Sequence, residues 1–200
     1  MTVDIPTLTY FSSRGLCEPI RFVLSEARVN YKEVGVGAYN PNDQPKEFLE
    51  LIESGKLPFN QLPIWEEPTG FVLSQSNAIL RHLARKYKLY GDSIEENGLV
   101  DSIMDAIWDL KYLLRQQHLN EQDKVFEVTL PKYFKFFERI LEKNRLIESL
   151  KVNDLNERFN FSQFPLLQKI YKSVSARPGI LKHLESSTRY PAQVFFSPRK

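Results

Sequence analysis

The sequence contains one cysteine, Cys17, among its 200 residues. A single thiol excludes an internal disulfide framework, a thiolate zinc cluster and a C-x-x-C redox pair, and it fits a reducing compartment. The sequence contains no run of about 18 apolar residues that could span a membrane. The first residues, MTVDIP, lack the basic and apolar regions of a signal peptide. We therefore expect a soluble, cytoplasmic protein without a membrane partner.

The chain also has little excess of positive or negative charge. The chain has 27 Lys and Arg against 25 Asp and Glu, a formal net charge of +2, and no long single-sign block that would attract nucleic acid. The three histidines, His82, His118 and His183, lack metal-ligand spacing, and no glycine pattern for phosphate binding is present. We therefore expect neither a metal site nor nucleic-acid binding.

The N-terminal part of the chain alternates short strand-like runs with amphipathic stretches. The strand-like runs are residues 7–11, 31–36, 62–65 and 71–73, and helical spacing occurs over 16–27, 46–52 and 79–87. The order β-α-β-α-β-β-α predicts a small mixed sheet covered by helices, which is an α/β thioredoxin-like arrangement.

The apolar spacing after residue 93 is almost entirely helical. It covers residues 94–117, 123–144, 146–156 and 165–185. These segments predict a separate all-α helical bundle. We therefore expect a thioredoxin-like domain of residues 1–87, a linker of residues 88–93 (KLYGDS) and a helical domain of residues 94–200.

Hydroxyl and thiol groups gather where the first strand ends and the first helix begins: Tyr10, Ser12, Ser13 and Cys17. Backbone N–H groups at such a junction favour negative charge. A tyrosine hydroxyl that donates to a bound thiol favours the thiolate, and lowering a thiol pKa by about two units stabilises it by about 2.7 kcal/mol. The alternatives are a buried strand tyrosine, serines that serve as turn or cap residues, and a cysteine that packs in the core.

Two further turns carry polar or unusual residues. Pro63 stands at the start of a predicted interior strand, where proline is normally excluded. A cis Leu62–Pro63 bond would free the backbone groups of Leu62 to pair with an extended peptide-like ligand, and a trans proline at a strand edge is the alternative. The run SQSN at 74–77 precedes a helix and offers N–H groups to a carboxylate, although N-capping explains two of its residues.

Six strings, in order over most of the chain, resemble the cytosolic glutathione transferases, nearest the pi, mu and sigma group. They are LTYFSSRGLC (8–17), LPFNQLP (57–63), QSNAILRHLAR (75–85), LYG (89–91), LVDSIMDAIWDL (99–110) and FPLL with SARP (164–178). The combination of QLP and QSN is specific to this family. The resemblance implies a thioredoxin-like N-terminal domain, an all-helical C-terminal domain and glutathione as cosubstrate without a metal.

The resemblance also implies a role for individual residues at a glutathione site. Tyr10 would hydrogen-bond and activate the glutathione sulfur, and Leu62, before a cis Pro63, would pair with the cysteinyl backbone. The remaining glutathione contacts would come from Leu16, where many pi and sigma members have arginine, from Gln61 near the glycyl side, from Gln75 and Ser76 at the γ-glutamyl carboxylate, and from Asp109, which would reach the γ-glutamyl amino group from a partner subunit.

A homodimer and an apolar substrate pocket are implied as well. Phe59 matches the aromatic key that inserts between helices of a partner subunit, and an exposed phenylalanine on a loop is otherwise hard to justify. The apolar pocket is expected between the two domains, near Phe11, Tyr112 and Leu119.

The sequence departs from the family pattern in two places. No tryptophan lies between Tyr31 and Phe59 to contact the glycyl carboxylate, so Lys56 or Lys46 would serve there. At the join of Asn144 and Arg145, roughly twenty residues of the family pattern are absent, including the capping box of a central helix. We interpret this as a segment omitted from the sequence.

These features favour a dimeric glutathione transferase that conjugates the glutathione thiolate to small hydrophobic electrophiles. One alternative is a carrier of haem or other hydrophobic anions with the same fold, and another is a sigma-like isomerase acting on a lipid peroxide, such as a prostaglandin synthase. Within the enzyme interpretation, Ser12 or Ser13 could replace the tyrosine, as serine does in other transferase classes.

Overall fold

The structure is a computed structural model that describes residues 4–118, 124–144 and 163–191. The chain divides into two compact units. Unit 1 comprises Met1–Tyr90 and Pro178–Lys200, and unit 2 comprises Gly91–Arg177. None of the helices in the described ranges is long and apolar enough to cross a membrane.

Unit 1 has the mixed sheet that the sequence predicts. Its elements are β1 (Thr7–Tyr10), the 3-10 helix η1 (Gly15–Cys17), α1 (Glu18–Glu26), β2 (Lys32–Gly35), α2 (Lys46–Glu53), β3 (Ile64–Glu66), β4 (Val72–Ser74), α3 (Ser76–Lys86) and α8 (Pro178–Leu184). The strand order is β2-β1-β3-β4, with β2 parallel to β1 and β3 antiparallel to both of its neighbours. The thioredoxin-like fold class is therefore confirmed.

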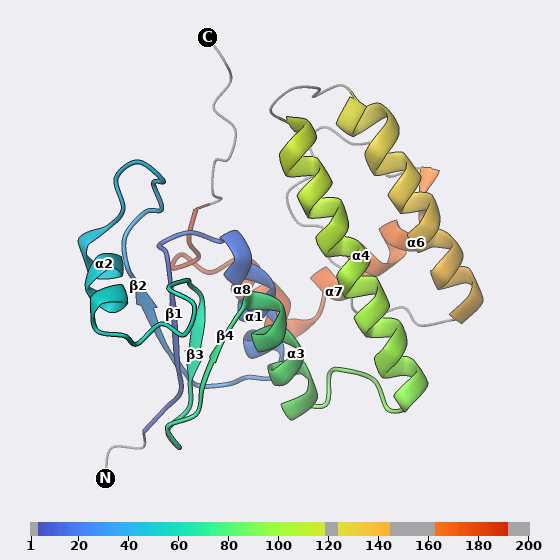
Figure 1. Ribbon diagram of the computed structural model, residues 1–200. Helices are drawn as coiled ribbons and strands as arrows, with labels where there is room; N and C mark the ends of the chain where they lie inside the picture. The colour runs from blue at the N-terminus through green and yellow to red at the C-terminus, as the bar shows by residue number, and fades with distance from the viewer. Residues whose placement is uncertain (1–3, 119–123, 145–162, 192–200) are drawn as a thin grey trace. The chain divides into compact units, whose positions relative to one another are not determined.

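Helices cover both faces of this sheet. In Figure 1, α2 lies on one side of the strands and α1 and α3 lie on the other. Because both faces of the sheet are covered, consecutive residues of β1 are buried although their side chains point to opposite faces. The residues of this core that are fully buried are Leu8, Cys17, Ile20, Leu24, Ile64, Trp65, Ile79 and Leu83.

The α8 helix packs closely on α1. Ser25 Oγ donates a hydrogen bond of 2.6 Å to the carbonyl oxygen of Gly179. A Cβ atom at Gly179 would lie 2.5 Å from Glu26 Cα, which no side chain tolerates, so only glycine permits this approach. The sequence predicts residues 178–200 as part of the helical domain, whereas α8 belongs to unit 1.

Unit 2 is helical. It contains α4 (Ile94–His118), the π-helical segment η2 (Val125–Thr129), α6 (Leu130–Asn144) and α7 (Pro165–Ser175). Phe134 of α6 meets Phe164 edge to face with ring centroids 5.5 Å apart, and both rings are buried. Glu138 caps α7, because its carboxylate accepts the N–H groups of Leu166 and Leu167 at 3.3 and 2.8 Å.

One helix prediction is wrong. The single helical run expected over 165–185 is two helices, α7 and α8, separated at Pro178. Proline has no N–H for the helix ladder and restricts the residue before it, so the run breaks there although its apolar spacing continues. The predicted helix over 146–156 and the join at Asn144 and Arg145 fall at or beyond the edge of the described residues.

Candidate active site

The strand register of unit 1 brings three turns to one edge of the sheet. Tyr10 ends β1, and the preceding residue, Thr9, pairs with Ile64, the first residue of β3. Ile64 in turn pairs with Ser74, the last residue of β4. The loop after β1, the turn before β3 and the turn after β4 therefore meet at this edge.

The two turns beside Tyr10 have the features expected of them. The Leu62–Pro63 peptide bond is cis, and the backbone of Leu62 makes no hydrogen bond within the described part of the chain. Gln75 has a φ of 72° and forms the N-cap of α3, whose first residue is the buried Ser76. The Gln75 side chain does not cap the helix; its Nε2 donates to Gln61 Oε1 at 3.2 Å instead. The structure thus brings Gln61, Leu62, Gln75 and Ser76 together, with the first N–H groups of α3 beside them.

The Tyr10 hydroxyl is oriented by the loop that follows β1. Its ring is buried, and its oxygen accepts a hydrogen bond of 3.2 Å from the Leu16 N–H. Burial raises the pKa of Tyr10, and the bond from Leu16 opposes that rise in part. The phenol is therefore protonated at neutral pH, and since the N–H occupies one lone pair of its oxygen, its own proton remains available to a ligand.

Tyr10 packs against Phe11, which joins it to a cluster of aromatic rings. Phe11 is buried and meets Tyr10, Tyr39 and Phe48 edge to face, with ring centroids 5.5, 5.0 and 5.1 Å apart. Phe48 comes from α2, whereas Tyr39 is partly exposed. Phe11 thus contributes mainly to the core beneath Tyr10, and Tyr39 is the ring of this group that reaches the surface.

The other hydroxyl and thiol groups of the junction differ from Tyr10. Cys17 is completely buried, and burial raises the pKa of its thiol far above the usual range, so this thiol is not a nucleophile. Ser13 is also buried, and its Oγ has no hydrogen-bond partner among the described residues. Ser12 donates its N–H to the carbonyl oxygen of Gly37 at 2.7 Å and thereby fixes the start of the loop.

Both lysines considered for a glycyl carboxylate have acidic partners. Lys56 Nζ lies 2.9 Å from Glu66 Oε1, and both side chains are partly exposed. Lys46 Nζ lies 3.2 Å from Glu50 Oε1 one turn further along α2 and is highly exposed. Either lysine would exchange a carboxylate of the chain for a ligand carboxylate, and Lys56 is the more sheltered of the two.

The remaining predicted site residues lie in several parts of the molecule. Phe59, on the loop between α2 and β3, is 63% exposed. Asp109 and Tyr112 are exposed on α4 of unit 2. Leu119 lies outside the described residues.

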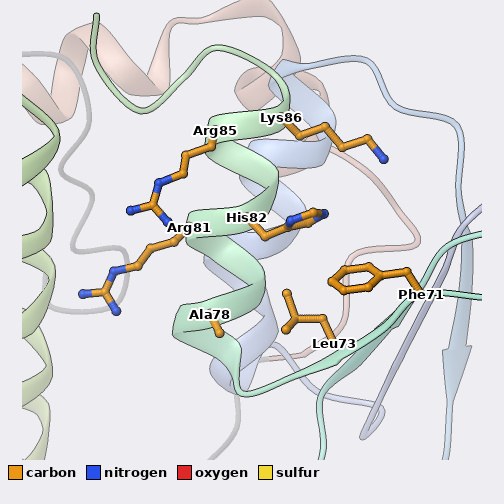
Figure 2. Close-up of a pocket in the computed structure, with 7 residues that line it drawn as sticks. All are labelled: Phe71, Leu73, Ala78, Arg81, His82, Arg85 and Lys86. Carbon is orange, nitrogen blue, oxygen red and sulfur yellow. The ribbon is translucent and has the colours of Figure 1, made fainter. Parts of the chain in front are cut away.

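A cavity of about 620 Å³, whose lining does not include Tyr10, lies in unit 1 (Figure 2). It is formed by β4, the turn before it and the outer face of α3, and its lining residues are Phe71, Leu73, Ala78, Arg81, His82, Arg85 and Lys86. His82 and Lys86 both contact the Glu67 carboxylate, at 3.1 and 2.6 Å. The described residues contain no group of three or more His, Cys, Asp and Glu side chains able to hold a metal ion.

The buried polar cluster around Arg21 is not among the features that the sequence predicts. Arg21 is 2% exposed, although it lies on the apolar stripe of α1 beside Ile20 and Leu24. The signal that could have revealed it is a charged pair, Glu18 and Arg21, spaced i, i+3 on a face that is otherwise apolar.

Comparison with known proteins identifies relatives of both units. Residues 6–85 match the family described as glutathione S-transferase, N-terminal domain. The chain is 31% identical to glutathione S-transferase 3 of Gallus gallus, over 92% of this chain and 87% of the relative, and 34% identical to glutathione S-transferase P 1 of Xenopus laevis, over 91% and 92%. It superimposes on the crystal structure of a nematode-specific GST of C. elegans with a TM-score of 0.75, at 26% identity and covering 92% of this chain and 97% of that one.

Proposed function

Because the chain belongs to the glutathione S-transferase family, we propose that it conjugates the glutathione thiolate to small hydrophobic electrophiles, with Tyr10 stabilising the thiolate. The observation that carries this proposal is the Tyr10 hydroxyl, which accepts the Leu16 N–H at 3.2 Å and keeps its own proton to donate. A thiolate is the nucleophilic form of a thiol, and a phenolic donor favours it at neutral pH.

Glutathione binding would use the three turns that meet beside Tyr10. The unpaired backbone of Leu62 offers an N–H and a C=O to the cysteinyl residue of the tripeptide, as an added strand would. The start of α3 at Gln75 and Ser76 offers N–H groups to the γ-glutamyl carboxylate. Gln61, held by Gln75, and Lys56 would lie toward the glycyl end, and Leu16 would complete the wall beside Tyr10.

The proposed reaction is nucleophilic attack by the glutathione sulfur. The thiol proton leaves to solvent, the sulfur electron pair forms the new bond to the electrophilic carbon, and the leaving group departs with its own electron pair. A thiol pKa lowered by about two units makes the thiolate fraction at neutral pH tens of times larger. Tyr112, which is exposed on α4, is proposed with Leu119 as part of the apolar surface that receives the second substrate. Phe11, which the resemblance also assigned to that surface, is buried and packs against Phe48.

Tyr10→Phe tests this function. We expect kcat/KM for conjugation of chlorodinitrobenzene to fall by about 10²-fold below the thiol pKa, because one donor to a developing charge is removed. Tyr133→Phe, which removes a phenol from α6 of unit 2, is the matched control and should keep full activity. Retained activity in Tyr10→Phe would move the role to Ser12 or Ser13, and glutathione binding without any turnover by the wild-type chain would favour a carrier of hydrophobic anions.

The active form would be a cytoplasmic homodimer in which Phe59 inserts into the partner and Asp109 reaches its glutathione. The exposed ring of Phe59 supports this arrangement, since a solvent-exposed aromatic side chain gains stability when a partner buries it. Phe59→Ser should therefore shift the sedimentation coefficient from dimer toward monomer. A monomeric wild-type chain at micromolar concentration would contradict the proposal.

A further inference from the structure

The chain beyond α8 returns to the loop that carries the candidate active site. We call residues 189–191 the C-terminal strap. The carbonyl oxygens of Tyr190 and Pro191 accept hydrogen bonds from Arg14, through its side-chain Nε at 2.9 Å and its backbone N–H at 3.2 Å. Arg14 lies two residues before Leu16, so the strap is fastened directly to the segment that contacts Tyr10.

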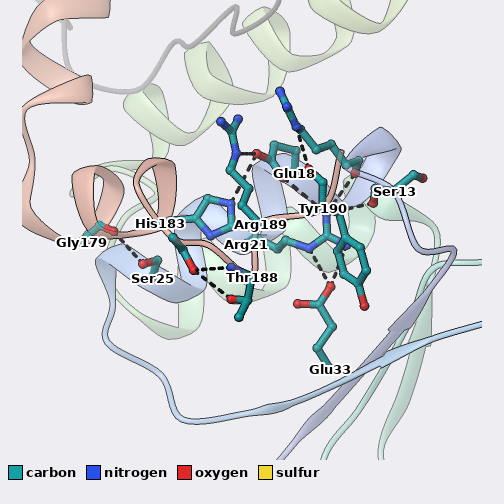
Figure 3. A network of polar contacts seen from close by, with 12 residues as sticks. Ser13, Glu18, Arg21, Ser25, Glu33, Gly179, His183, Thr188, Arg189 and Tyr190 are labelled. Carbon is teal, nitrogen blue, oxygen red and sulfur yellow. Dashed lines mark hydrogen bonds and ion pairs between the residues drawn. The ribbon is translucent and has the colours of Figure 1, made fainter. Parts of the chain in front are cut away.

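Ionic contacts hold the strap on α1 (Figure 3). Arg189 Nε donates to Glu18 Oε1 at 2.6 Å, and His183 Nε2 lies 3.3 Å from the same oxygen. The Tyr190 ring covers the Arg21 guanidinium, with 4.9 Å between Cζ and the ring centroid. The strap thus meets α1 through one ion pair and one stacked cation, at buried or half-buried positions.

Arg21 of α1 connects the strap to the loop that follows β1. Its Nη1 donates to the carbonyl oxygens of Ser13 and Arg14, both at 3.1 Å. Its charge is balanced by Glu33, whose Oε1 accepts from Nε at 2.7 Å, and by Glu18 at 3.3 Å. Glu33 fixes the guanidinium through Nε, and Nη1, which donates to the two carbonyl groups, also lies 3.3 Å from Glu18 Oε2, so the planar group is held between the carboxylates and the loop.

The segment that Arg21 and the strap contact leads to Leu16, whose backbone N–H contacts Tyr10. The carbonyl of Arg14 also accepts the N–H groups of Cys17 and Glu18 at 3.1 and 3.0 Å, which fixes the turn of η1 around Leu16. The Leu16 N–H, in the middle of that turn, then donates to Tyr10 Oη. A bond that polarises the phenol and occupies one of its lone pairs leaves the phenolic proton to point elsewhere, toward the proposed sulfur.

We propose that Arg21 and the C-terminal strap are positioning elements of the reaction, which hold residues 13–16 so that the Leu16 N–H keeps Tyr10 oriented as a donor to the glutathione sulfur. The proposal rests on the proposed function. Neither element touches the sulfur, so both act through Leu16 and Tyr10. Loosening either one should therefore weaken thiolate stabilisation while the sites that bind the two ends of the tripeptide stay intact.

Two readouts separate positioning from a merely structural role. The pH dependence of kcat/KM for chlorodinitrobenzene gives the apparent pKa of the bound thiol, and the Kd of S-methylglutathione reports binding of a tripeptide that has no ionisable thiol. For Arg189→Met and Arg14→Met we expect the apparent thiol pKa to rise by about 0.5 to 1, which is about a three- to tenfold lower kcat/KM below that pKa. The Kd of S-methylglutathione should change less than twofold.

Two further variants guard against a charge effect. Lys182→Met removes a positive charge at an exposed position of α8 without touching the strap, and it should leave the apparent thiol pKa unchanged. Tyr190→Leu changes no charge, but it removes the ring that covers the Arg21 guanidinium, so it should raise the thiol pKa. Arg21→Lys should raise it too, and urea unfolding of each variant shows which ones are folded.

The outcomes distinguish this proposal from the proposed function. A wild-type chain without glutathione-dependent turnover would overturn the proposed function itself. If the wild type is active, an unchanged thiol pKa in Arg189→Met, Arg14→Met and Tyr190→Leu would overturn the positioning role, whatever their stability. An equal rise of the thiol pKa in Lys182→Met would also overturn it, because the effect would then be one of net charge.

Discussion

The buried carboxylate of Glu18 makes the stability of unit 1 depend on pH in a defined window. Glu18 is 6% exposed, and its oxygens lie 2.6 Å from Arg189 Nε, 3.3 Å from His183 Nε2 and 3.3 Å from Arg21 Nη1. Burial alone would raise the pKa of the carboxyl, but the hydrogen bonds from His183 and Arg189 outweigh burial and lower the pKa from 4.5 to about 2.

A folded-state pKa below the unfolded value stabilises the fold above pH 4.5, and this stabilisation is lost as the pH falls from 4.5 to about 2. The difference corresponds to about 3 kcal/mol at 25 °C. Glu18→Gln removes this carboxylate and should therefore lower the free energy of unfolding by about 3 kcal/mol at neutral pH. The loss acts in the same direction as a second effect, since buried cations are left without their full counter-charge. The gap between the variant and the wild type should close as the pH falls through this window.

Urea unfolding followed by tryptophan fluorescence measures this effect, since Trp65 is fully buried in unit 1. Glu47→Gln is the matched control, because Glu47 is exposed on α2 and its removal should leave the pH profile unchanged. Parallel pH profiles of Glu18→Gln and the wild type between pH 4.5 and about 2 would refute the reasoning, since the carboxylate would then interact equally in the folded and unfolded chains.

Three further predictions concern packing, reactivity and ligand contact. Gly179→Ala should destabilise unit 1 by about 1–3 kcal/mol in urea unfolding, because its Cβ would meet the backbone of α1. The control is Gly98→Ala in α4, where nothing lies within 4 Å of the added Cβ, and it should stabilise the protein by about 0.5–1 kcal/mol. Equal losses of stability in the two variants would contradict the packing argument. The buried Cys17 thiol should resist a disulfide reagent until the chain is unfolded, and rapid labelling of the native protein would show that the site opens. Lys56→Met should raise the KM for glutathione severalfold with little change in kcat, whereas an effect confined to Lys46→Met would place the glycyl carboxylate at the start of α2.

The parts of the fold that follow local rules were predictable from the sequence. The strand and helix order of residues 7–87 was correct because alternation, helical spacing and the turn residues agree within each short segment. The cis Leu62–Pro63 bond was one of two possibilities from the residues alone, and only the resemblance to a family favoured it. The break at Pro178 was missed because apolar spacing continues through a residue that cannot continue the helix ladder.

The polar cluster beneath the candidate site could not be predicted by the same rules. Arg189 and Glu18 are 171 residues apart, so no periodicity or turn motif links them, and each charge read alone suggests a solvated surface. Burial of one charge is tolerated only when partners from elsewhere in the fold arrive, and here they come from α1, β2 and the segment after α8. The position of Tyr10 at the end of β1 was predictable from a local pattern, whereas Arg189 and Tyr190, which contact Glu18 and Arg14, come from the segment after α8.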